Sequence, residues 1–128
     1  MGDRSVNRSV DRTAWIDVEW MDDCVVVHVG GELDASVAGL LRQAVVTSTP
    51  FSSLIIDLGE VPFMDSSGLG AVISGLRHVR EGGGRAGIAR PRRSIRHLLE
   101  MSGVDRLVPI GATPDAVVAA FVEEAASQ

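Results

Sequence analysis

Two adjacent serines, Ser66 and Ser67, are the side chains of this sequence best placed to do chemistry. They lie in the run Phe63–Gly70, which follows a short apolar segment and opens a stretch with helical periodicity. The first turn of a helix has backbone N–H groups without intrahelical partners, and the helix dipole favours an anion there. The two hydroxyls therefore suit either a plain helix cap or a serine that is reversibly phosphorylated, and the residue types alone leave both uses open.

The same serines do not indicate a serine hydrolase. The nucleophile turn of such enzymes needs Gly-x-Ser-x-Gly, whereas Met64 and Asp65 stand two positions before Ser66 and Ser67. Nothing in the sequence ties any of the three histidines to a general-base role: His28, His78 and His97. We therefore expect that the chain is not an enzyme.

The usual signals of a cofactor or metal site are also missing. The triple glycine Gly82–Gly84 follows a predicted helix rather than a strand, and neither a P-loop nor a dinucleotide-binding fingerprint occurs. His28, in an apolar strand, is interpreted as a satisfied core or edge residue rather than a ligand. The arginines of Arg90–Arg93, with Arg96, indicate either a solvated helix start, which is favoured, or a patch for an acidic partner or a phosphate. The sequence thus predicts no cofactor and no metal.

Composition indicates one soluble domain in the cytoplasm. The 128 residues are 45 % hydrophobic and carry a net charge of −5, which argues against direct DNA binding. No apolar stretch approaches the roughly 20 residues of a membrane span, and the N-terminus lacks the apolar core of a signal peptide. Cys24 lies in an apolar run and is interpreted as a buried structural thiol. Residues 1–13 are polar and aperiodic, so we expect a disordered leader before a single domain over residues 14–124.

Strand-like and helix-like patterns alternate along that domain. The predicted strands are Trp15–Trp20, Cys24–Val29, Leu54–Leu58, Arg85–Ala89 and Leu107–Ile110. Helices are expected after the caps Asp34, Ser94 and Thr113 and at the serine pair. The helix at the serine pair has an apolar stripe of Leu69, Val72, Ile73, Leu76 and Val79. This order predicts an α/β fold with a mixed, mainly parallel sheet of four to five strands, an antiparallel edge strand and about four helices.

Three segments of the chain share their motifs and order with a known family. Gly-Glu-Leu-Asp ends at Asp34, Val61–Gly70 follows the strand Leu54–Leu58, and Arg92–Gly103 completes the set. Together they span roughly Trp15 to Phe121, and over this length the chain resembles the anti-sigma-factor antagonists of bacteria, the STAS-domain family.

The resemblance implies a regulator of transcription without catalysis of its own. Such a protein binds an anti-sigma factor that is also a serine kinase and thereby frees a sigma factor, for example in a stress response. A serine/threonine phosphatase of the metal-dependent class reverses the phosphorylation. The family motif places the modified hydroxyl on the serine before the glycine, here Ser67, with Ser66 as second choice. The implied partner-binding residues are Gly31, Asp34, Asp65, Ser66, Ser67, Gly68 and Leu69.

Two alternatives stay open beside this partner-switching function. One is a non-catalytic scaffold subunit of a stress-signalling complex with the same fold. The other is a module that binds a small ligand at the end of the sheet. The oligomeric state is also left open between a monomer and a weak homodimer, since Trp15 and Trp20 near a predicted edge strand could support self-association.

Overall fold

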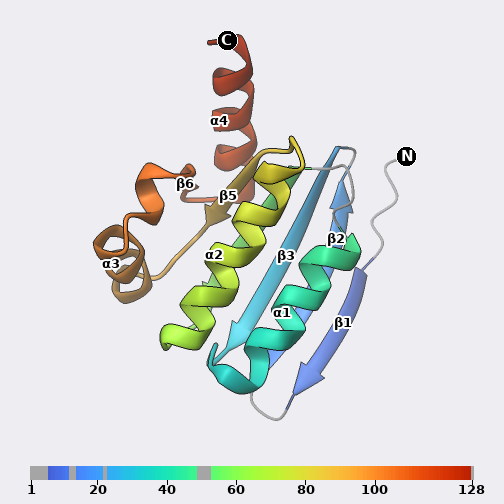
Figure 1. The fold of residues 1–128 in the computed structure, drawn as a ribbon, viewed down its shortest axis with the longest axis vertical. Coiled ribbons are helices and arrows are strands. Elements are labelled where there is room, and N and C mark those ends of the chain that lie inside the picture. Colours follow the sequence, from blue (N-terminus) through green and yellow to red (C-terminus); the bar gives the residue numbers. More distant parts are fainter. Residues whose placement is uncertain (1–5, 12–13, 22, 49–52, 128) are drawn as a thin grey trace.

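The chain forms one six-stranded sheet with helices on both faces (Figure 1). The structure, a computed structural model, describes residues 6–11, 14–21, 23–48 and 53–127, with backbone alone for the first range. The strands are β1 (Val6–Asp11), β2 (Ala14–Met21), β3 (Cys24–Gly31), β4 (Ser53–Glu60), β5 (Ala86–Ala89) and β6 (Ile110–Gly111). The helices are α1 (Ala35–Ser48), α2 (Ser66–Glu81), α3 (Arg93–Met101) and α4 (Pro114–Ala126), with a 3₁₀ turn η1 at Val104–Arg106.

The strands lie in the order β1-β2-β3-β4-β5-β6, with β1–β2 and β2–β3 antiparallel and the other pairs parallel. The predicted mixed α/β sheet is confirmed, but with six strands rather than four to five. The extra strand is β1, so the expected disordered leader is wrong for Val6–Asp11, and residues 1–5 and 12–13 lie outside the described residues. Because β1 pairs with β2, Trp15 and Trp20 do not lie on an edge strand.

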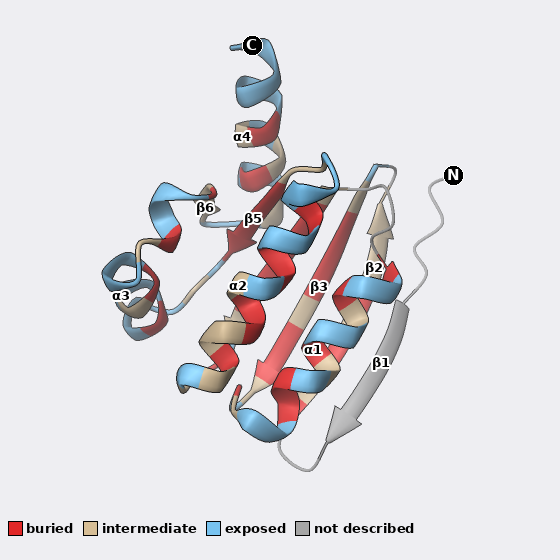
Figure 2. Cartoon of the chain, viewed as in Figure 1, coloured by how far each residue is buried: buried red, intermediate tan, exposed pale blue. Residues whose placement is uncertain are grey.

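Alternation along the central strands builds two separate apolar layers. Side chains of a strand point to opposite faces in turn, and Val25, Val27 and Val29 pack under α1 and α2 in the main core. Val26 points the other way and packs with Val117 and Phe121 of α4. Figure 2 shows the buried side of α1 and α2 turned toward the sheet, as expected for amphipathic helices on a sheet.

Most of the described helices begin directly after their predicted N-cap residues. Thr113 accepts a hydrogen bond from the Ala116 N–H at 3.1 Å, with proline in the first turn of α4. The expected cap at Ser94 is wrong, because α3 already begins at Arg93 and no side chain caps it. The expected strand Leu107–Ile110 is also wrong in extent, since the chain turns through η1 and only Ile110–Gly111 joins the sheet.

The buried stripe of α2 is rotated from the predicted one. Val72, Leu76 and Val79 are buried as expected, while Leu69 and Ile73 are only partly buried. Their places on the buried side are taken by small residues, Gly68, Ala71 and Gly75. The helix therefore approaches α1 and the sheet closely along a line of small residues, and the larger side chains flank that line.

Candidate functional site

The head of α2 is built by Asp65, which acts as its N-cap. Asp65 has extended backbone, and its Oδ1 accepts a hydrogen bond from the Gly68 N–H at 3.0 Å. Ser66 and Ser67 are thus the first two residues of the helix, Ser66 exposed and Ser67 half-buried. Backbone N–H groups at these positions have no intrahelical acceptor. The arrangement places both hydroxyls at the positive end of a 16-residue helix, where an added anion is stabilised.

The loop after β3 fixes this helix head in space. Leu33 forms an isolated parallel bridge with Met64, its N–H donating to the Phe63 carbonyl at 2.9 Å. The Asp65 N–H in turn donates to the Leu33 carbonyl at 3.3 Å. A Cβ atom on Gly68 would lie 2.1 Å from the Leu33 oxygen, so only glycine fits there. The backbone of Leu33 therefore sets the position of the serines. In the sequence, Leu33 is marked only as part of the Gly-Glu-Leu-Asp motif.

Asp34 lies in this loop, and Gly31 is the last residue of β3 just before it. Asp34 Oδ1 accepts hydrogen bonds from the Ser36 hydroxyl at 2.6 Å and from the Ser36 N–H at 3.0 Å, at the start of α1. The hydrogen bond from the Ser36 hydroxyl lowers the pKa of Asp34, which is therefore a carboxylate at neutral pH. Gly31 has φ of 85°, a left-handed conformation that favours glycine at the end of β3. The structure thus brings both residues to the same end of the sheet as the α2 head.

Beside the helix head lies an apolar groove between the loop after β4 and α3. Its volume is about 260 Å³, and it is lined by Pro62, Phe63, Met64, Ser94, Ile95, His97, Leu98 and Met101. Phe63 is 51 % exposed and Met101 is 73 % exposed, which is unusual for large apolar side chains. Phe63 and Met64 of the groove immediately precede the Asp65 cap in the chain, so the groove lies close in sequence to the serines, which do not line it. In the sequence, Met101 is marked only by its place in the segment Arg92–Gly103.

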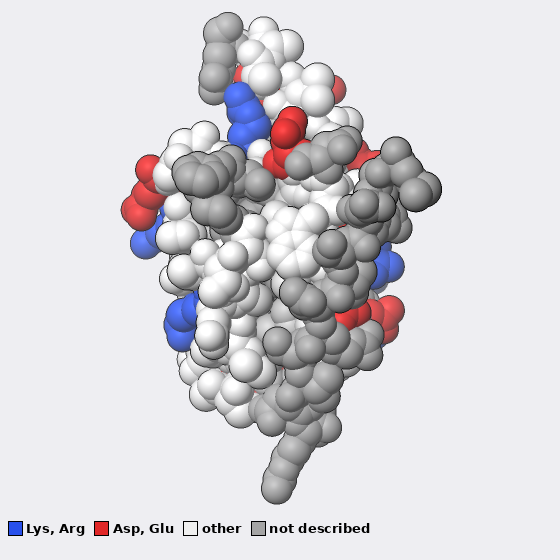
Figure 3. Space-filling view, turned by 90° about the vertical axis from the view of Figure 1, so that its right-hand side faces the viewer, with Lys and Arg blue, Asp and Glu red and all other residues white. Residues whose placement is uncertain are grey.

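Three of the four arginines near α3 have acidic partners, and the fourth, Arg93, is exposed. Arg90 is paired with Asp57, Arg92 lies 4.0 Å from Glu60, and Arg96 lies 3.3 Å from Glu100. Figure 3 shows the opposite side of the molecule, the β1 side, where the visible charged side chains of both signs are scattered. This pairing agrees with a solvated helix start rather than a site for an acidic partner.

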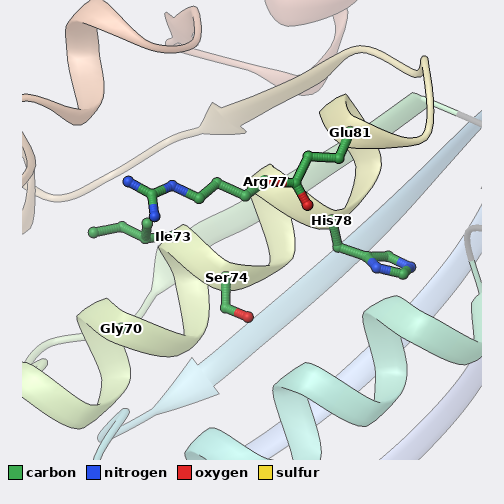
Figure 4. A pocket seen from close by; sticks show the side chains of 6 residues that line it. All are labelled: Gly70, Ile73, Ser74, Arg77, His78 and Glu81. Carbon is green, nitrogen blue, oxygen red and sulfur yellow. The ribbon is translucent and has the colours of Figure 1, made fainter.

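A depression lies along α2, away from the end of the sheet where the ligand-binding alternative expects its site. It measures about 360 Å³ and is lined by Gly70, Ile73, Ser74, Arg77, His78 and Glu81, all from this one helix (Figure 4). Arg77 and His78 point to opposite sides of the helix. The depression contains neither serine, so it lends no support to a ligand pocket built around the α2 head.

Three other properties of the described part of the chain bear on metal binding, thiol reactivity and membrane spanning. There, no group of three or more His, Cys, Asp or Glu side chains could hold a metal ion. Burial raises the pKa of the half-buried Cys24 thiol to about 11, so this side chain stays protonated and unreactive at neutral pH. None of the described helices is long and apolar enough to cross a bilayer.

Comparison with known proteins agrees with this fold. The family model of the STAS domain matches residues 16–117, and the chain therefore belongs to the STAS domain family. An anti-sigma F factor antagonist of Paenibacillus polymyxa is 26 % identical over 98 residues, which cover 74 % of this chain and 84 % of that protein.

Solved structures of other proteins have a similar fold. An anti-sigma factor antagonist from Mycobacterium paratuberculosis is 30 % identical, with a TM-score of 0.72 over 88 % of this chain and 97 % of that one. The Bacillus cell fate determinant SpoIIAA in the phosphorylated form is 20 % identical and shares the fold, with a TM-score of 0.57 over 91 % and 99 % of the two chains. Within the STAS family, the chain is thus similar to anti-sigma factor antagonists.

Proposed function

We propose that this chain is an anti-anti-sigma factor whose docking surface is the head of α2 with the adjoining groove. It acts in the cytoplasm, binds an anti-sigma factor that is also a serine kinase, and so releases a sigma factor. Phosphorylation of Ser67 ends the binding, and a metal-dependent serine/threonine phosphatase restores it. The names of the relatives support the antagonist part, since they are anti-sigma factor antagonists.

The observation that carries the switch is the position of Ser67 at the second residue of α2, only partly buried and a few residues along the chain from an apolar groove. A phosphate there adds about −1.5 to −2 charges and three acceptor oxygens. The fold tolerates this group, because the free N–H groups and the helix dipole stabilise an anion at that end. Modification therefore changes the surface and leaves the fold intact.

The docked complex does not tolerate the same group. Phe63 and Met101 offer apolar area that a partner would cover, and this covering would bring Ser67 into the interface. Burying a phosphate without a matched cation costs several kcal/mol. A loss of about 4 kcal/mol would weaken binding roughly a thousandfold. Charge on one side chain is thus enough to exchange partners without a change of fold.

Phosphopeptide mass spectrometry on the chain incubated with its kinase partner and ATP tests the assignment. Wild type is expected to gain one phosphate on Ser67, and Ser67→Ala is expected to gain none while still binding the partner. Ser66→Ala is the matched control and should be labelled as wild type. Full labelling of Ser67→Ala would show that another residue is phosphorylated. A chain that binds its partner yet is never phosphorylated would favour the scaffold alternative.

A further inference from the structure

A polar cluster occupies the sheet face opposite α1 and α2. His28 and Asp57 share the side of the sheet that Val26 and Ile55 present to α4, because each lies two residues further along the same strand. α4 contributes apolar side chains to that face, Val117 and Phe121. The cluster also includes Glu19 from β2 and Arg90, which follows β5.

These four side chains connect four neighbouring strands. The Nδ1 atom of His28 lies 2.6 Å from Asp57 Oδ2, and its Nε2 lies 2.8 Å from Glu19 Oε1. Arg90 donates from Nε to Asp57 Oδ1 and from Nη2 to Oδ2, both at 3.0 Å. Asp57 is only 2 % exposed, so this buried carboxylate is enclosed by charged and hydrogen-bonding partners.

The cluster lies where the pairing of β3 and β4 is irregular. His28 pairs with Asp57, but Gly30 pairs with Glu60, so β4 contains one extra residue at this point. Gly59 lies in that stretch, and its N–H donates to Asp57 Oδ1 at 2.9 Å, while Arg92 Nε donates to its carbonyl at 3.2 Å. The side chains of Asp57, from the cluster, and of the neighbouring Arg92 thus satisfy the backbone N–H and carbonyl of Gly59 at the bulge.

The guanidinium group of Arg90 lies against the same glycine. A Cβ atom on Gly59 would lie 2.7 Å from the Arg90 Cζ atom, so the guanidinium rests directly on the Gly59 backbone. Arg90 itself has φ of 55°, a left-handed conformation that residues with a side chain rarely adopt. Its N–H donates to the Gly111 carbonyl at 2.9 Å, which holds this strained residue in place.

We propose that Glu19, His28, Asp57 and Arg90 form a clamp that fixes Gly59 and thereby the segment 59–65 leading into α2, and that the clamp is complete only when His28 carries a proton. The segment has its second fixed point at the bridge between Leu33 and Met64. Loss of the clamp would leave segment 59–65 held by that bridge and by the core packing of Val61 and Met64. This inference rests on the fold and not on the proposed function.

The proton matters because His28 faces carboxylates on both sides. Protonated imidazole donates from both ring nitrogens, whereas neutral imidazole has a single N–H and turns a lone pair toward one of the two carboxylates. The groups facing His28 are Asp17 and Glu19 from β2, Asp57 from β4 and, beyond Asp57, Arg90. The hydrogen bond to Asp57 raises the pKa of His28, burial lowers it, and Glu19 adds to the rise. The clamp therefore opens as the pH rises through this raised value.

Two measurements on the full wild-type chain test the clamp. NMR of the imidazole ring locates the titration of His28. Hydrogen exchange of segment 59–65 is then measured below and above that titration, corrected for intrinsic exchange and referred to α4. The expected result is a loss of protection in segment 59–65 above the titration, with the Gly59 amide shift following the imidazole. Unchanged relative protection across the titration would overturn the proposal.

Paired variants add an independent readout. His28→Gln is expected to show the low protection of segment 59–65 at both pH values, because both N–H donors of the amide lie on one nitrogen and the amide oxygen cannot donate to the second carboxylate. His78→Gln, an exposed histidine on α2, is the matched control and should keep the pH dependence of wild type. Full protection in His28→Gln would contradict the clamp. If that variant does not fold, the wild-type titration decides alone.

Discussion

Substitution of Gly68 by alanine tests how closely the α2 head approaches the loop after β3. The new Cβ atom would lie 2.1 Å from the Leu33 oxygen and 2.9 Å from the Leu33 carbonyl carbon. Because these are backbone atoms, no rotamer change relieves the overlap. Relief requires the two backbones to separate by about 1 Å, since carbon and oxygen in contact lie about 3.3 Å apart.

This separation breaks the two hydrogen bonds that join the segments, from Leu33 N–H to Phe63 and from Asp65 N–H to Leu33. Each contributes about 1 kcal/mol, and the residual overpacking costs about 1–3 kcal/mol. The higher helix propensity of alanine offsets about 1 kcal/mol of this loss of stability. The free energy of unfolding should therefore fall by about 2–4 kcal/mol, and the melting temperature by roughly 6–20 °C.

Gly70→Ala is the matched control for this measurement. It lies in the same helix, and its nearest heavy atom would be Arg42 Nη2 at 3.8 Å, an ordinary contact. We expect it to raise the free energy of unfolding by about 0.5–1 kcal/mol through helix propensity. Thermal and urea denaturation of both variants give the comparison. A Gly68→Ala variant as stable as wild type, or a Gly70→Ala variant that is equally destabilised, would refute the close approach.

Three further predictions concern the core, the switch and the buried carboxylate. Val72→Ala should cost about 1–3 kcal/mol and Leu69→Ala less, because only Val72 is fully buried; equal urea midpoints would contradict this. Ser67→Asp should weaken partner binding yet keep the melting temperature within a few degrees, and an unfolded variant would make Ser67 chiefly structural. Burial alone would raise the pKa of Asp57, but hydrogen bonds from His28, Arg90 and Gly59 hold it at about 2, below its ordinary 3.8. The folded state therefore binds this proton less readily than the unfolded state, and about 2 kcal/mol of stability should be lost as the pH falls from about 4 toward 2. Asp57→Asn should lack this acid dependence in urea titrations, and an equal slope in both proteins would exclude Asp57 as its source.

The sequence predicted the elements whose burial follows a simple period. Alternation over Trp15–Trp20 predicted a strand, and the alternate residues Ile16 and Val18 of β2 are both buried. Asp34 and Thr113 also mark helix starts as predicted, because capping is a local interaction between a side chain and the next few backbone N–H groups.

The parts that sequence reasoning missed depend on pairing between distant segments. Val6–Asp11 has few apolar residues, and it becomes a strand because β2 offers it an unpaired edge. His28 and Asp57 meet because β3 and β4 pair in parallel in that register, which no local pattern encodes. The small residues of α2 were likewise overlooked, because a search for an apolar stripe favours large side chains over the glycines that permit close packing.

The proposed Ser67 switch is tested most directly by comparing two forms of this chain, one with unmodified Ser67 and one stoichiometrically phosphorylated there. The quantity compared is their affinity for the proposed partner, an anti-sigma factor that is also a serine kinase. Isothermal titration should show binding of the unmodified form and binding weakened roughly a thousandfold on phosphorylation, with the melting temperature of the free chain almost unchanged. Equal affinities of the two forms would contradict the claim that charge at the α2 head controls docking.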